Sequence, residues 1–327
     1  MTKPISNGFV GKPKITVVIP AYKVSRQILA TIESVGPDVA HIIVVDDACC
    51  EGSGKLVATT SRDSRVEVIF HTENMGVGGA LKTGYMRALE LESSVIVKID
   101  GDGQMDPTKI PEMSRLIIEG EADYVKGNRF FDIETVRSMP LTRILGNLAL
   151  SFFAKFSTGY WRIFDPNNGF TAISSTALSR IQLAKVDNRY FFESDILFRL
   201  NLARAVVVDY PMDAIYGEEK SNLKIRRVLF EFPYKHFRNF FKRIAYTYYL
   251  RDFTLASLEL PIGVILCSFG FVSGVLNFEA SRALNQATAP GTLILITMSV
   301  LVGVQLILSF FSYDIDSSPT KPISKRR

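Results

Sequence analysis

The sequence predicts an α/β fold with a mostly parallel sheet, followed by a membrane-anchoring pair of helices. Three observations lead to this prediction. Short β-branched runs alternate with helix-like segments in the first half of the chain, acidic residues follow the ends of these runs, and two long apolar runs lie after residue 253. The 327 residues suffice for one domain of about 200 residues and a smaller second part.

Four runs have the composition of buried strands, at residues 15–20, 41–46, 66–70 and 95–100. Helix-like segments follow them near residues 25–35, 53–62, 77–92 and 107–120, and the pattern changes to mixed helices and shorter strands after about residue 140. Parallel sheets covered by helices bind ligands beyond the carboxyl ends of their strands. We therefore expect the site among the polar residues that follow these runs, which are Asp46, Asp47, Asn74, Asp100 and Asp102.

The charges and cysteines exclude several classes of protein. The net charge is +5, and Lys and Arg gather at residues 220–251 and 321–327 beside apolar segments, which favours an anionic membrane surface over nucleic acid. Cys49 and Cys50 are adjacent, and the three cysteines have no zinc or disulfide spacing. Residues 1–14 lack the apolar core of a signal peptide, so we expect a reduced, cytoplasmic catalytic part.

Residues 221–252 are rich in both cations and aromatic rings, which predicts amphipathic helices in the headgroup layer of a membrane. A helix packed on the main domain is the alternative. Two apolar runs follow at residues 258–276 and 291–311, each of about 20 residues and long enough to cross a hydrocarbon core of about 30 Å. The connector carries only Glu279 and Arg282, while both outer flanks are basic, so a hairpin over residues 253–313 should have both ends in the cytoplasm, with a basic tail at residues 314–327.

Asp100-Gly101-Asp102 is a candidate metal site, because two carboxylates on one turn can reach a single hard cation such as Mg²⁺ or Mn²⁺. Such a cation would neutralise a leaving diphosphate, and Gln104 offers a further oxygen. An Asp-x-Asp on a loop is common by itself. Its place at a strand end, near Asp46 and Asp47 at a neighbouring end, favours the metal interpretation.

The glycines of residues 74–79 do not form a phosphate loop, because Leu81 stands where a P-loop has Gly before Lys and where a dinucleotide fingerprint has its third Gly. We interpret them as allowing close approach of neighbouring backbone. Arg129 and Arg143 are candidates to bind phosphate oxygens through bidentate hydrogen bonds, with solvated surface arginines as the plain alternative.

In their order along residues 14–220, these motifs resemble glycosyltransferase family two with the GT-A fold, and within it the polyprenyl-phosphate sugar synthases such as dolichyl-phosphate mannose synthase. The motifs are residues 18–22 (VIPAY), 44–47 (VVDD), 74–76 (NMG), 100–104 (DGDGQ), 127–129 (GNR), 143–147, 165–170 (DPNNGF) and 217–220 (GEEK). Val24 departs from the pattern, because the mannose synthases carry an acid there, which argues against recognition of guanine.

The resemblance implies a role for each matching residue. Pro20, Tyr22, Asp46, Asp47 and Asp100 would bind the donor nucleotide, and Asp102 and Gln104 would hold the metal. The acceptor phosphate would be bound by Arg129, Arg143, Asn147 and Lys220. Asp195 matches an acidic position that faces the sugar in relatives, with Glu193 as the competing choice, and the implied catalytic set is therefore Asp100, Asp102, Asp195, Arg129 and Arg143.

The implied reaction is an inverting transfer of a hexose, with UDP-glucose as the expected donor, to polyprenyl phosphate at the cytoplasmic face of a bacterial-type inner or plasma membrane. A lipid phosphate is largely dianionic at neutral pH, since its second pKa is about 6, and needs no dedicated general base. The sequence leaves open whether the protein forms a homo-oligomer. The alternatives are a GDP-mannose-dependent synthase and a non-catalytic sugar- or lipid-binding membrane protein; a processive polysaccharide synthase does not fit the surroundings of Trp161.

Overall fold

The computed structural model describes residues 13–131, 141–212 and 225–326, without the side chains of residues 142, 143 and 225–230. The chain divides into two compact units. The first, which we call the sheet unit, holds the residues up to Phe240 together with those from Pro319 onward. The second, which we call the hairpin unit, holds Phe241–Ser318.

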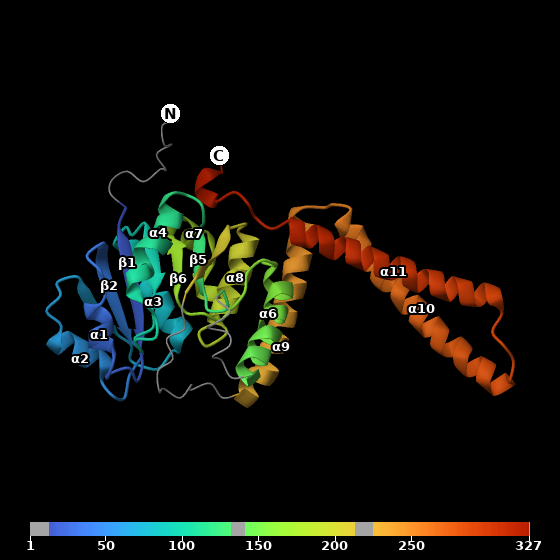
Figure 1. Ribbon diagram of the computed structural model, residues 1–327, viewed down its shortest axis with the longest axis horizontal. Coiled ribbons are helices and arrows are strands. Elements are labelled where there is room, and N and C mark those ends of the chain that lie inside the picture. The colour runs from blue at the N-terminus through green and yellow to red at the C-terminus, as the bar shows by residue number, and fades with distance from the viewer. Residues whose placement is uncertain (1–12, 132–140, 213–224, 327) are drawn as a thin grey trace. The chain divides into compact units, whose positions relative to one another are not determined.

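The sheet unit is built on a seven-stranded sheet with the order β3-β2-β1-β4-β6-β5-β7 (Figure 1). Its strands are β1 (Ile15–Ala21), β2 (Val39–Asp46), β3 (Val66–Phe70), β4 (Val95–Lys98), β5 (Tyr124–Asn128), β6 (Thr171–Ser174) and β7 (Val207–Pro211). Only β6 runs antiparallel to its neighbours β4 and β5, and the other pairs are parallel. The predicted mostly parallel sheet is confirmed.

Helices cover both faces of the sheet, as the continuous apolar strand runs predict. Alternate strand residues such as Val17 and Val18 belong to two separate core clusters. One cluster includes residues of α3 (Val77–Glu90), α7 (Ser175–Arg180) and α8 (Phe192–Leu202). The other includes residues of α1 (Ile28–Glu33), α2 (Ser53–Thr60) and α4 (Ile110–Ile118). The unit also contains α6 (Leu141–Thr158), most of α9 (Ile225–Ala245), and the short helices η1 (Pro107–Lys109) and η2 (Leu183–Lys185).

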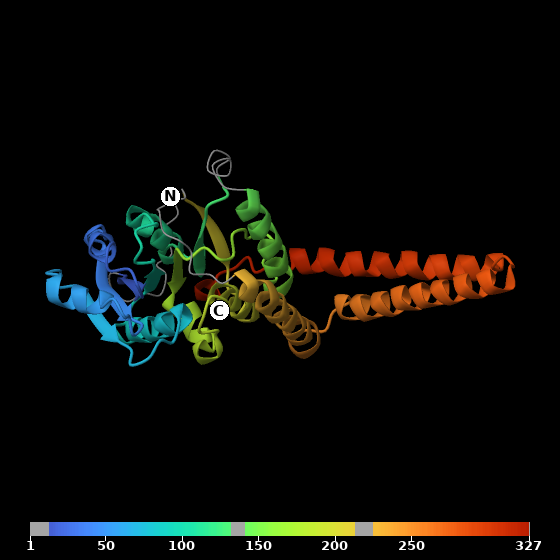
Figure 2. The ribbon, with the colours of Figure 1, turned by 90° about the horizontal axis from the view of Figure 1, so that it is seen from below.

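The hairpin unit continues from the end of α9 through a turn of π-helix, η3 (Tyr246–Arg251), into two long helices, α10 (Ala256–Leu284) and α11 (Pro290–Asp316). The two helices lie side by side in both views (Figures 1 and 2) and are long and apolar enough to cross a membrane. Glycines allow the close packing, because a Cβ atom on Gly263 would lie 2.8 Å from the carbonyl oxygen of Gly303.

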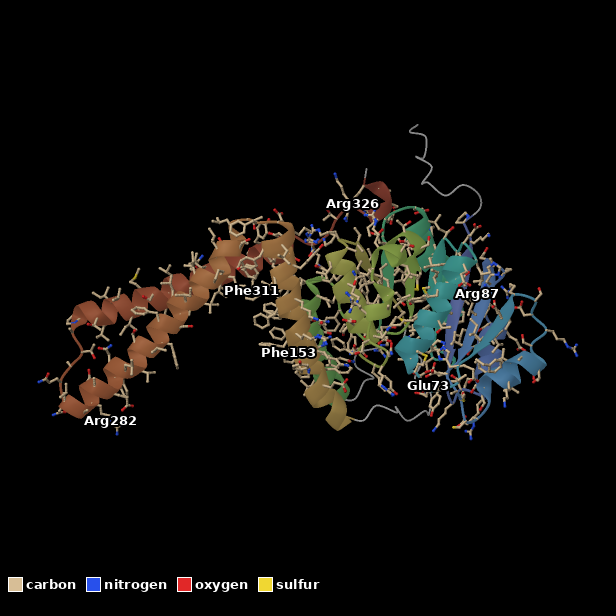
Figure 3. All side chains as sticks on the ribbon, turned by 180° about the vertical axis from the view of Figure 1, so that it is seen from behind. Glu73, Arg87, Phe153, Arg282, Phe311 and Arg326 are labelled. Carbon is tan, nitrogen blue, oxygen red and sulfur yellow. The ribbon has the colours of Figure 1, made fainter. Side chains whose placement is uncertain are left out.

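The helices are longer than the apolar runs that predicted them. The expected connector, residues 277–290, is mostly helical, and only residues 285–289 join α10 to α11. Asn285 ends α10 in the left-handed conformation with φ of 48°, and Arg282 lies in the last turn of α10, at the closed end of the hairpin (Figure 3).

A buried ion pair ties the start of the hairpin unit to the end of α11. Arg243 donates to both carboxylate oxygens of Asp314, at 2.6 and 2.9 Å, and the Tyr248 hydroxyl donates to the same carboxylate at 2.7 Å. Arg243 and Asp314 are almost completely buried. A buried charge pair is stable only when its hydrogen bonds are satisfied, and three donors to Asp314 meet this condition.

Residues 314–327, which the sequence predicts to be a basic tail, are divided between the end of α11 and the sheet unit. Residues up to Asp316 continue α11, and the chain from Pro319 belongs to the sheet unit, where it ends in the short helix η4 (Ile323–Lys325). Ile323 is buried in the sheet core, and its backbone N–H donates to both oxygens of Asp123, at 2.9 and 3.0 Å. The segment from Pro319 onward is basic overall, so the sequence pattern does not indicate that its one isoleucine packs in the core.

Candidate functional site

The loops that follow β1, β2 and β4 meet at the carboxyl edge of the sheet, where the sequence predicts the site. The backbone N–H of Lys23 donates to Cys49 Sγ at 3.1 Å, and that of Asp47 donates to the carbonyl oxygen of Ala21 at 3.1 Å. A Cβ atom on Gly101 would lie 3.1 Å from Val24. The loop after β1 therefore contacts both of its neighbours. Pro20 and Tyr22 lie at this end of β1, and Tyr22 is exposed.

Asp46 and Asp47 are buried, and their carboxylates hold the beginnings of two helices. Asp46 accepts from the N–H of Cys49 at 2.7 Å and of Gly54, in the first turn of α2, at 2.6 Å. Asp47 accepts from the N–H groups of Met75 and Gly76, just before α3, both at 2.8 Å. Negative charge is favourable at a helix N-terminus. The two acids shape the loops of the site, and their contact with a nucleotide stays a prediction.

The glycines before and within α3 allow the close backbone approach that the sequence predicts. A Cβ atom on Gly76 would come 2.6 Å from the carbonyl oxygen of Asn188, and one on Gly78 would clash with the carbonyl oxygen of Asp187. The segment that contains Asp187 and Asn188 thus packs directly on the start of α3. This interpretation of the glycine loop is confirmed.

A buried cluster of charges lies beside the Asp100-Gly101-Asp102 turn. Lys98, the last residue of β4, is only 2% exposed, and its Nζ lies 3.1 Å from Asp100 Oδ1 and 3.2 Å from Glu193 Oε1. Burial by itself lowers the pKa of Lys98, but the neighbouring carboxylates outweigh burial and raise it overall. Burial also raises the pKa of Glu193, and Lys98 offsets part of this effect.

Lys98 is not among the site residues that the sequence predicts, although the sequence contains a signal for it. A single lysine among the apolar residues of VIVKI must be buried if the run is a strand covered on both faces, and a buried ammonium needs a charged partner. The same reasoning applies to Lys126 in β5, which is completely buried.

The structure brings Glu193, rather than Asp195, to the Asp100 cluster. Asp195 is buried, and its Oδ2 accepts from the N–H of Asp187 at 3.0 Å and from Arg199 Nε at 3.2 Å. Its Oδ1 accepts from Asn239 of α9 at 3.0 Å. Asp195 therefore joins α8 to α9, and the geometry favours Glu193, the competing choice, as the acid nearer to the site.

Asp102 and Gln104 lie on the turn that follows Asp100, and Gly103 shapes it with a φ of 73°. The backbone N–H of Gln104 donates to Asp102 Oδ1 at 3.0 Å. Across the described parts of the chain, no three His, Cys, Asp or Glu side chains gather closely enough to hold a metal by themselves. Mg²⁺ is usually bound by one or two carboxylates and completed by phosphate and water oxygens. The oxygen donors of this turn fit such an ion.

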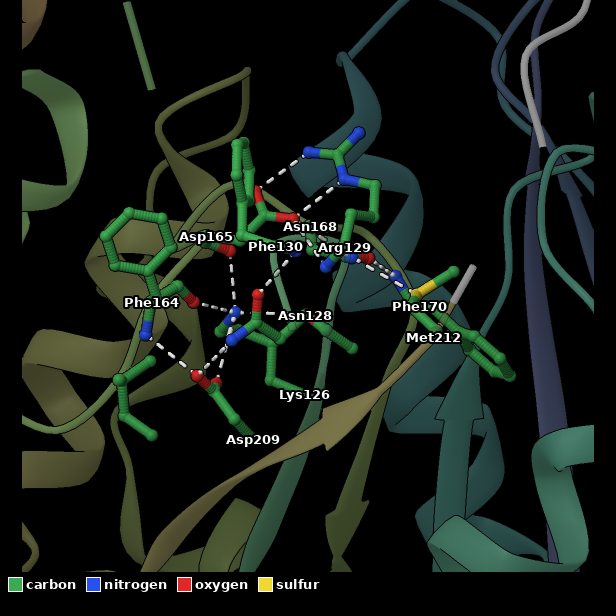
Figure 4. A network of polar contacts seen from close by, with 12 residues as sticks. Lys126, Asn128, Arg129, Phe130, Phe164, Asp165, Asn168, Phe170, Asp209 and Met212 are labelled. Atoms are coloured by element: carbon green, nitrogen blue, oxygen red, sulfur yellow. Dashed lines mark hydrogen bonds and ion pairs between the residues drawn. The ribbon is translucent and has the colours of Figure 1, made fainter. Parts of the chain in front are cut away.

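Arg129 is fixed by an acid from the loop before β6 (Figure 4). Its Nε and Nη2 donate to the two oxygens of the buried Asp165, at 2.7 and 2.8 Å. Burial acts to raise the pKa of Asp165, but Arg129 and Lys126 outweigh it and lower the pKa. The predicted phosphate ligand is thus oriented by a bidentate ion pair, and contact with a phosphate stays a prediction.

Lys126 holds the same loop from within the sheet (Figure 4). Its Nζ donates to the carbonyl oxygens of Phe164 and Asp165, both at 2.6 Å, and lies 3.5 Å from Asp209 Oδ1 on β7. Burial lowers the pKa of Lys126. Asn168 in this loop accepts from the N–H of Phe170 at 2.9 Å. Several hydrogen bonds and one ion pair therefore hold the loop at residues 165–169 in place.

The structure describes the other predicted acceptor-binding residues incompletely. Arg143 and Asn147 lie one turn apart on α6, and the side chain of Arg143 is among those that are not described. Lys220 lies outside the described residues. The structure leaves their role in phosphate binding as a prediction.

Helix α9 packs on the sheet unit with one face and exposes aromatic rings on the other, and its place in a headgroup layer stays a prediction. One face packs on the sheet unit, where His236 Nδ1 lies 2.7 Å from Ser157 Oγ of α6, and Phe232, His236 and Asn239 are buried. The other face exposes Tyr234 and Phe237. Helix α6 also exposes apolar side chains, namely Leu141, Leu145, Leu148, Phe152 and Phe153, the last of which is labelled in Figure 3.

Comparisons with known proteins agree with this geometry. Residues 16–182 match the family described as Glycosyl transferase family 2. The UDP-N-acetylglucosamine–dolichyl-phosphate N-acetylglucosaminyltransferase of Methanococcus voltae is 30% identical over 218 residues, which cover 62% of this chain and 86% of that protein. The polyprenol monophosphomannose synthase of Mycolicibacterium smegmatis is 30% identical over 227 residues, covering 66% and 84%.

A solved structure supports the fold. Glucosyl-3-phosphoglycerate synthase from Mycobacterium tuberculosis, in complex with Mn²⁺, uridine diphosphate and glucosyl-3-phosphoglycerate, superimposes with a TM-score of 0.52 at 18% identity. The match covers 71% of this chain and 80% of that one. At this identity the likeness concerns the fold alone.

Proposed function

This chain belongs to glycosyltransferase family 2, and we propose that it transfers a sugar from a nucleotide sugar to a polyprenyl phosphate at a membrane surface. The observation that carries the proposal is the convergence of three loops at one sheet edge, around a carboxylate turn that suits a divalent cation. Two further features support it. The relatives named above act on lipid phosphates, and the chain has two helices that suit a membrane anchor.

The residues of the carboxylate turn define the donor side. Asp100, Asp102 and Gln104 would hold Mg²⁺ or Mn²⁺, and the ion would neutralise the negative charge of the leaving diphosphate. The acceptor phosphate oxygen forms the new bond to the anomeric carbon while the bond from that carbon to the diphosphate oxygen breaks, with inversion. The acceptor is already an anion, so these residues need to position the reactants and stabilise charge.

Cations and apolar surfaces define the acceptor side. Arg129, oriented by Asp165, would bind the lipid phosphate together with Arg143, Asn147 and Lys220. The polyprenyl tail stays in the bilayer, so its phosphate lies near the membrane surface. The exposed rings and aliphatic side chains of α6 and α9 suit the headgroup layer and would hold the sheet unit there.

The hairpin unit would anchor the enzyme. The chain leaves the sheet unit after Phe240 and returns to it at Pro319, and two antiparallel spans bring a chain back to the side from which it started. The flanks of the hairpin are basic, which predicts a cytoplasmic sheet unit.

UDP-glucose stays our prediction for the donor. One relative named above transfers N-acetylglucosamine and another mannose, so the donors of both sugars are tested as well. Membranes that contain the full chain should be incubated with undecaprenyl phosphate and, separately, radiolabelled UDP-glucose, UDP-N-acetylglucosamine and GDP-mannose. We expect labelled lipid with one donor, its loss with EDTA, and its recovery with Mn²⁺ or Mg²⁺. Asp102→Ala serves as the inactive control. Absence of labelled lipid with all three donors, from protein that still binds nucleotide, would favour the non-catalytic alternative.

A further inference from the structure

Two buried lysines lie at the same level of the sheet. Lys98 of β4 and Lys126 of β5 both pair in register with Thr171 of β6, the strand between them. Residues paired in register point to the same face of a sheet, so the two lysine side chains leave the same face from backbone positions about 10 Å apart by the usual strand spacing. Lys98 is 2% exposed and Lys126 is 0% exposed.

The two lysines have different partners. Lys126 donates to the carbonyl oxygens of Phe164 and Asp165, and its ion-pair partner is Asp209 on the neighbouring edge strand β7. These contacts give Lys126 a structural role. Lys98 instead lies between Asp100, of the carboxylate turn, and Glu193, at the start of α8. Lys98 thus connects the predicted metal site to a buried acid that is 95 residues away in the chain.

Stability alone does not explain an ammonium at residue 98. A buried ion pair can often be replaced by apolar side chains without loss of stability, because desolvation of the charges offsets their attraction. Gly169 packs closely against the Lys98 Nζ and against Asp100, and the two carboxylates of Asp100 and Glu193 lie within 3.2 Å of that Nζ. The ammonium is therefore held beside the carboxylate turn.

We propose that Lys98 is a positioning residue that serves as an internal counter-charge: it fixes the Asp100 carboxylate and cancels the charge of Glu193. The three carboxylates of Asp100, Asp102 and Glu193, less the one ammonium, leave two negative charges. These two negative charges are neutralised by one divalent cation. The site with its cation then carries no net negative charge that would repel a diphosphate. The inference rests on the proposed function, since it assumes that a metal and a nucleotide diphosphate bind at this turn.

The balance predicts opposite effects on two ligands. Lys98→Met would leave three negative charges, which attract a bare cation more strongly but repel a diphosphate. We expect Mn²⁺ alone to bind about threefold more tightly, and UDP at saturating Mn²⁺ to bind about tenfold more weakly. A residue that only supports the fold would weaken both ligands together.

The test uses the full chain in detergent micelles at pH 7.5, with titration calorimetry of Mn²⁺ alone and then of UDP or GDP in the presence of Mn²⁺. Adding Glu193→Gln to Lys98→Met should return both affinities to within about threefold of the original protein, because the site again carries two negative charges. Glu193→Gln alone leaves one negative charge and should weaken the binding of Mn²⁺. Lys126→Met is the matched control: it should lower the unfolding temperature and, because it reaches the carboxylate turn only through the loop at residues 165–169, any change in the two affinities should be in the same direction.

Three results would overturn the proposal: a parallel loss of both ligands in Lys98→Met without rescue, an equal effect of Lys126→Met, or no effect of Glu193→Gln. If Lys98→Met does not fold, Glu193→Gln and the double variant still decide the matter. Failure of the original protein to bind UDP and GDP would count against the proposed function instead, and the Mn²⁺ titrations would still judge Lys98.

Discussion

Gly169 lies so close to Asp100 that a Cβ atom at residue 169 would come within 2.6 Å of Asp100 Oδ2. The same atom would strike the Lys98 ammonium. Glycine is required here by the close approach of the loop before β6 to the carboxylate turn. This loop is also fastened by Arg129 and Lys126, so it cannot move aside without breaking those contacts.

Gly169→Ala should therefore displace Asp100 or the loop itself. We expect sugar transfer to fall by at least about tenfold, since sub-ångström errors in the position of a catalytic group have effects of this size. Transfer rates and unfolding temperatures of the purified variant provide the check. Gly36→Ala is the control, because a Cβ atom at residue 36 meets nothing within 4 Å. Unchanged transfer by Gly169→Ala would show that the loop yields easily.

Glu193 and Asp195 can be separated by their different partners. Glu193→Gln removes a charge from the Asp100 cluster, so we expect slower transfer with little change in unfolding temperature. Asp195→Asn weakens the contacts with Arg199 and the backbone of Asp187, and it should cost about 1–3 kcal/mol of unfolding free energy while transfer stays within about threefold. The reverse pattern would return the catalytic assignment to Asp195.

His236 predicts a pH dependence of stability. Burial lowers its pKa to about 4, whereas the unfolded chain has the usual value of about 6.5. The unfolded state therefore binds the proton more tightly, and the stability present above pH 6.5 is lost as the pH falls toward 4. The loss at pH 5 should be about 2 kcal/mol.

Unfolding of the chain in micelles, followed between pH 7.5 and 4.5, measures this effect. His236→Gln does not titrate and can keep the hydrogen bond to Ser157. We expect the variant to lose less stability over the same pH range. Identical pH profiles for the two proteins would exclude His236 as the source.

Ile323 predicts that the segment after the hairpin supports the sheet unit. Ile323→Ala should cost about 2–4 kcal/mol of unfolding free energy, because it opens a cavity in the core. Lys325→Ala, at an exposed residue of the same short helix, is the control and should have little effect. Equal stability of both variants would mean that the segment does not stay docked in solution.

Much of the fold follows from local patterns in the sequence. The strands at residues 15–20 and 41–46 are buried on both faces, so their apolar runs are continuous and their positions could be predicted closely. The ends of α10 could not, because residues 277–284 are helical without being strongly apolar. A hydrophobic run marks the part of a helix that avoids water and not its full length.

The site was predictable only where it depends on one strand end. The carboxylate turn follows its strand directly, but the partner of Lys98 lies on a helix that the chain reaches 95 residues later. Glu193 and Asp195 are two residues apart, which is about 200° around a helix. The rotation of α8 about its axis in the packed core decides which of the two acids faces Asp100. The local sequence does not determine this rotation.

The return of the chain at Pro319 has a consequence for biosynthesis. The sheet unit encloses the hairpin as an insertion, and residues 319–326 leave the ribosome after both long helices. Before these residues are synthesised, the Asp123 carboxylate lacks the hydrogen bond from the Ile323 amide. The core of the sheet unit also lacks the Ile323 side chain. The sheet unit can therefore be completed only after the hairpin unit has been synthesised, and a fragment that ends before the hairpin would lack a part of its own core.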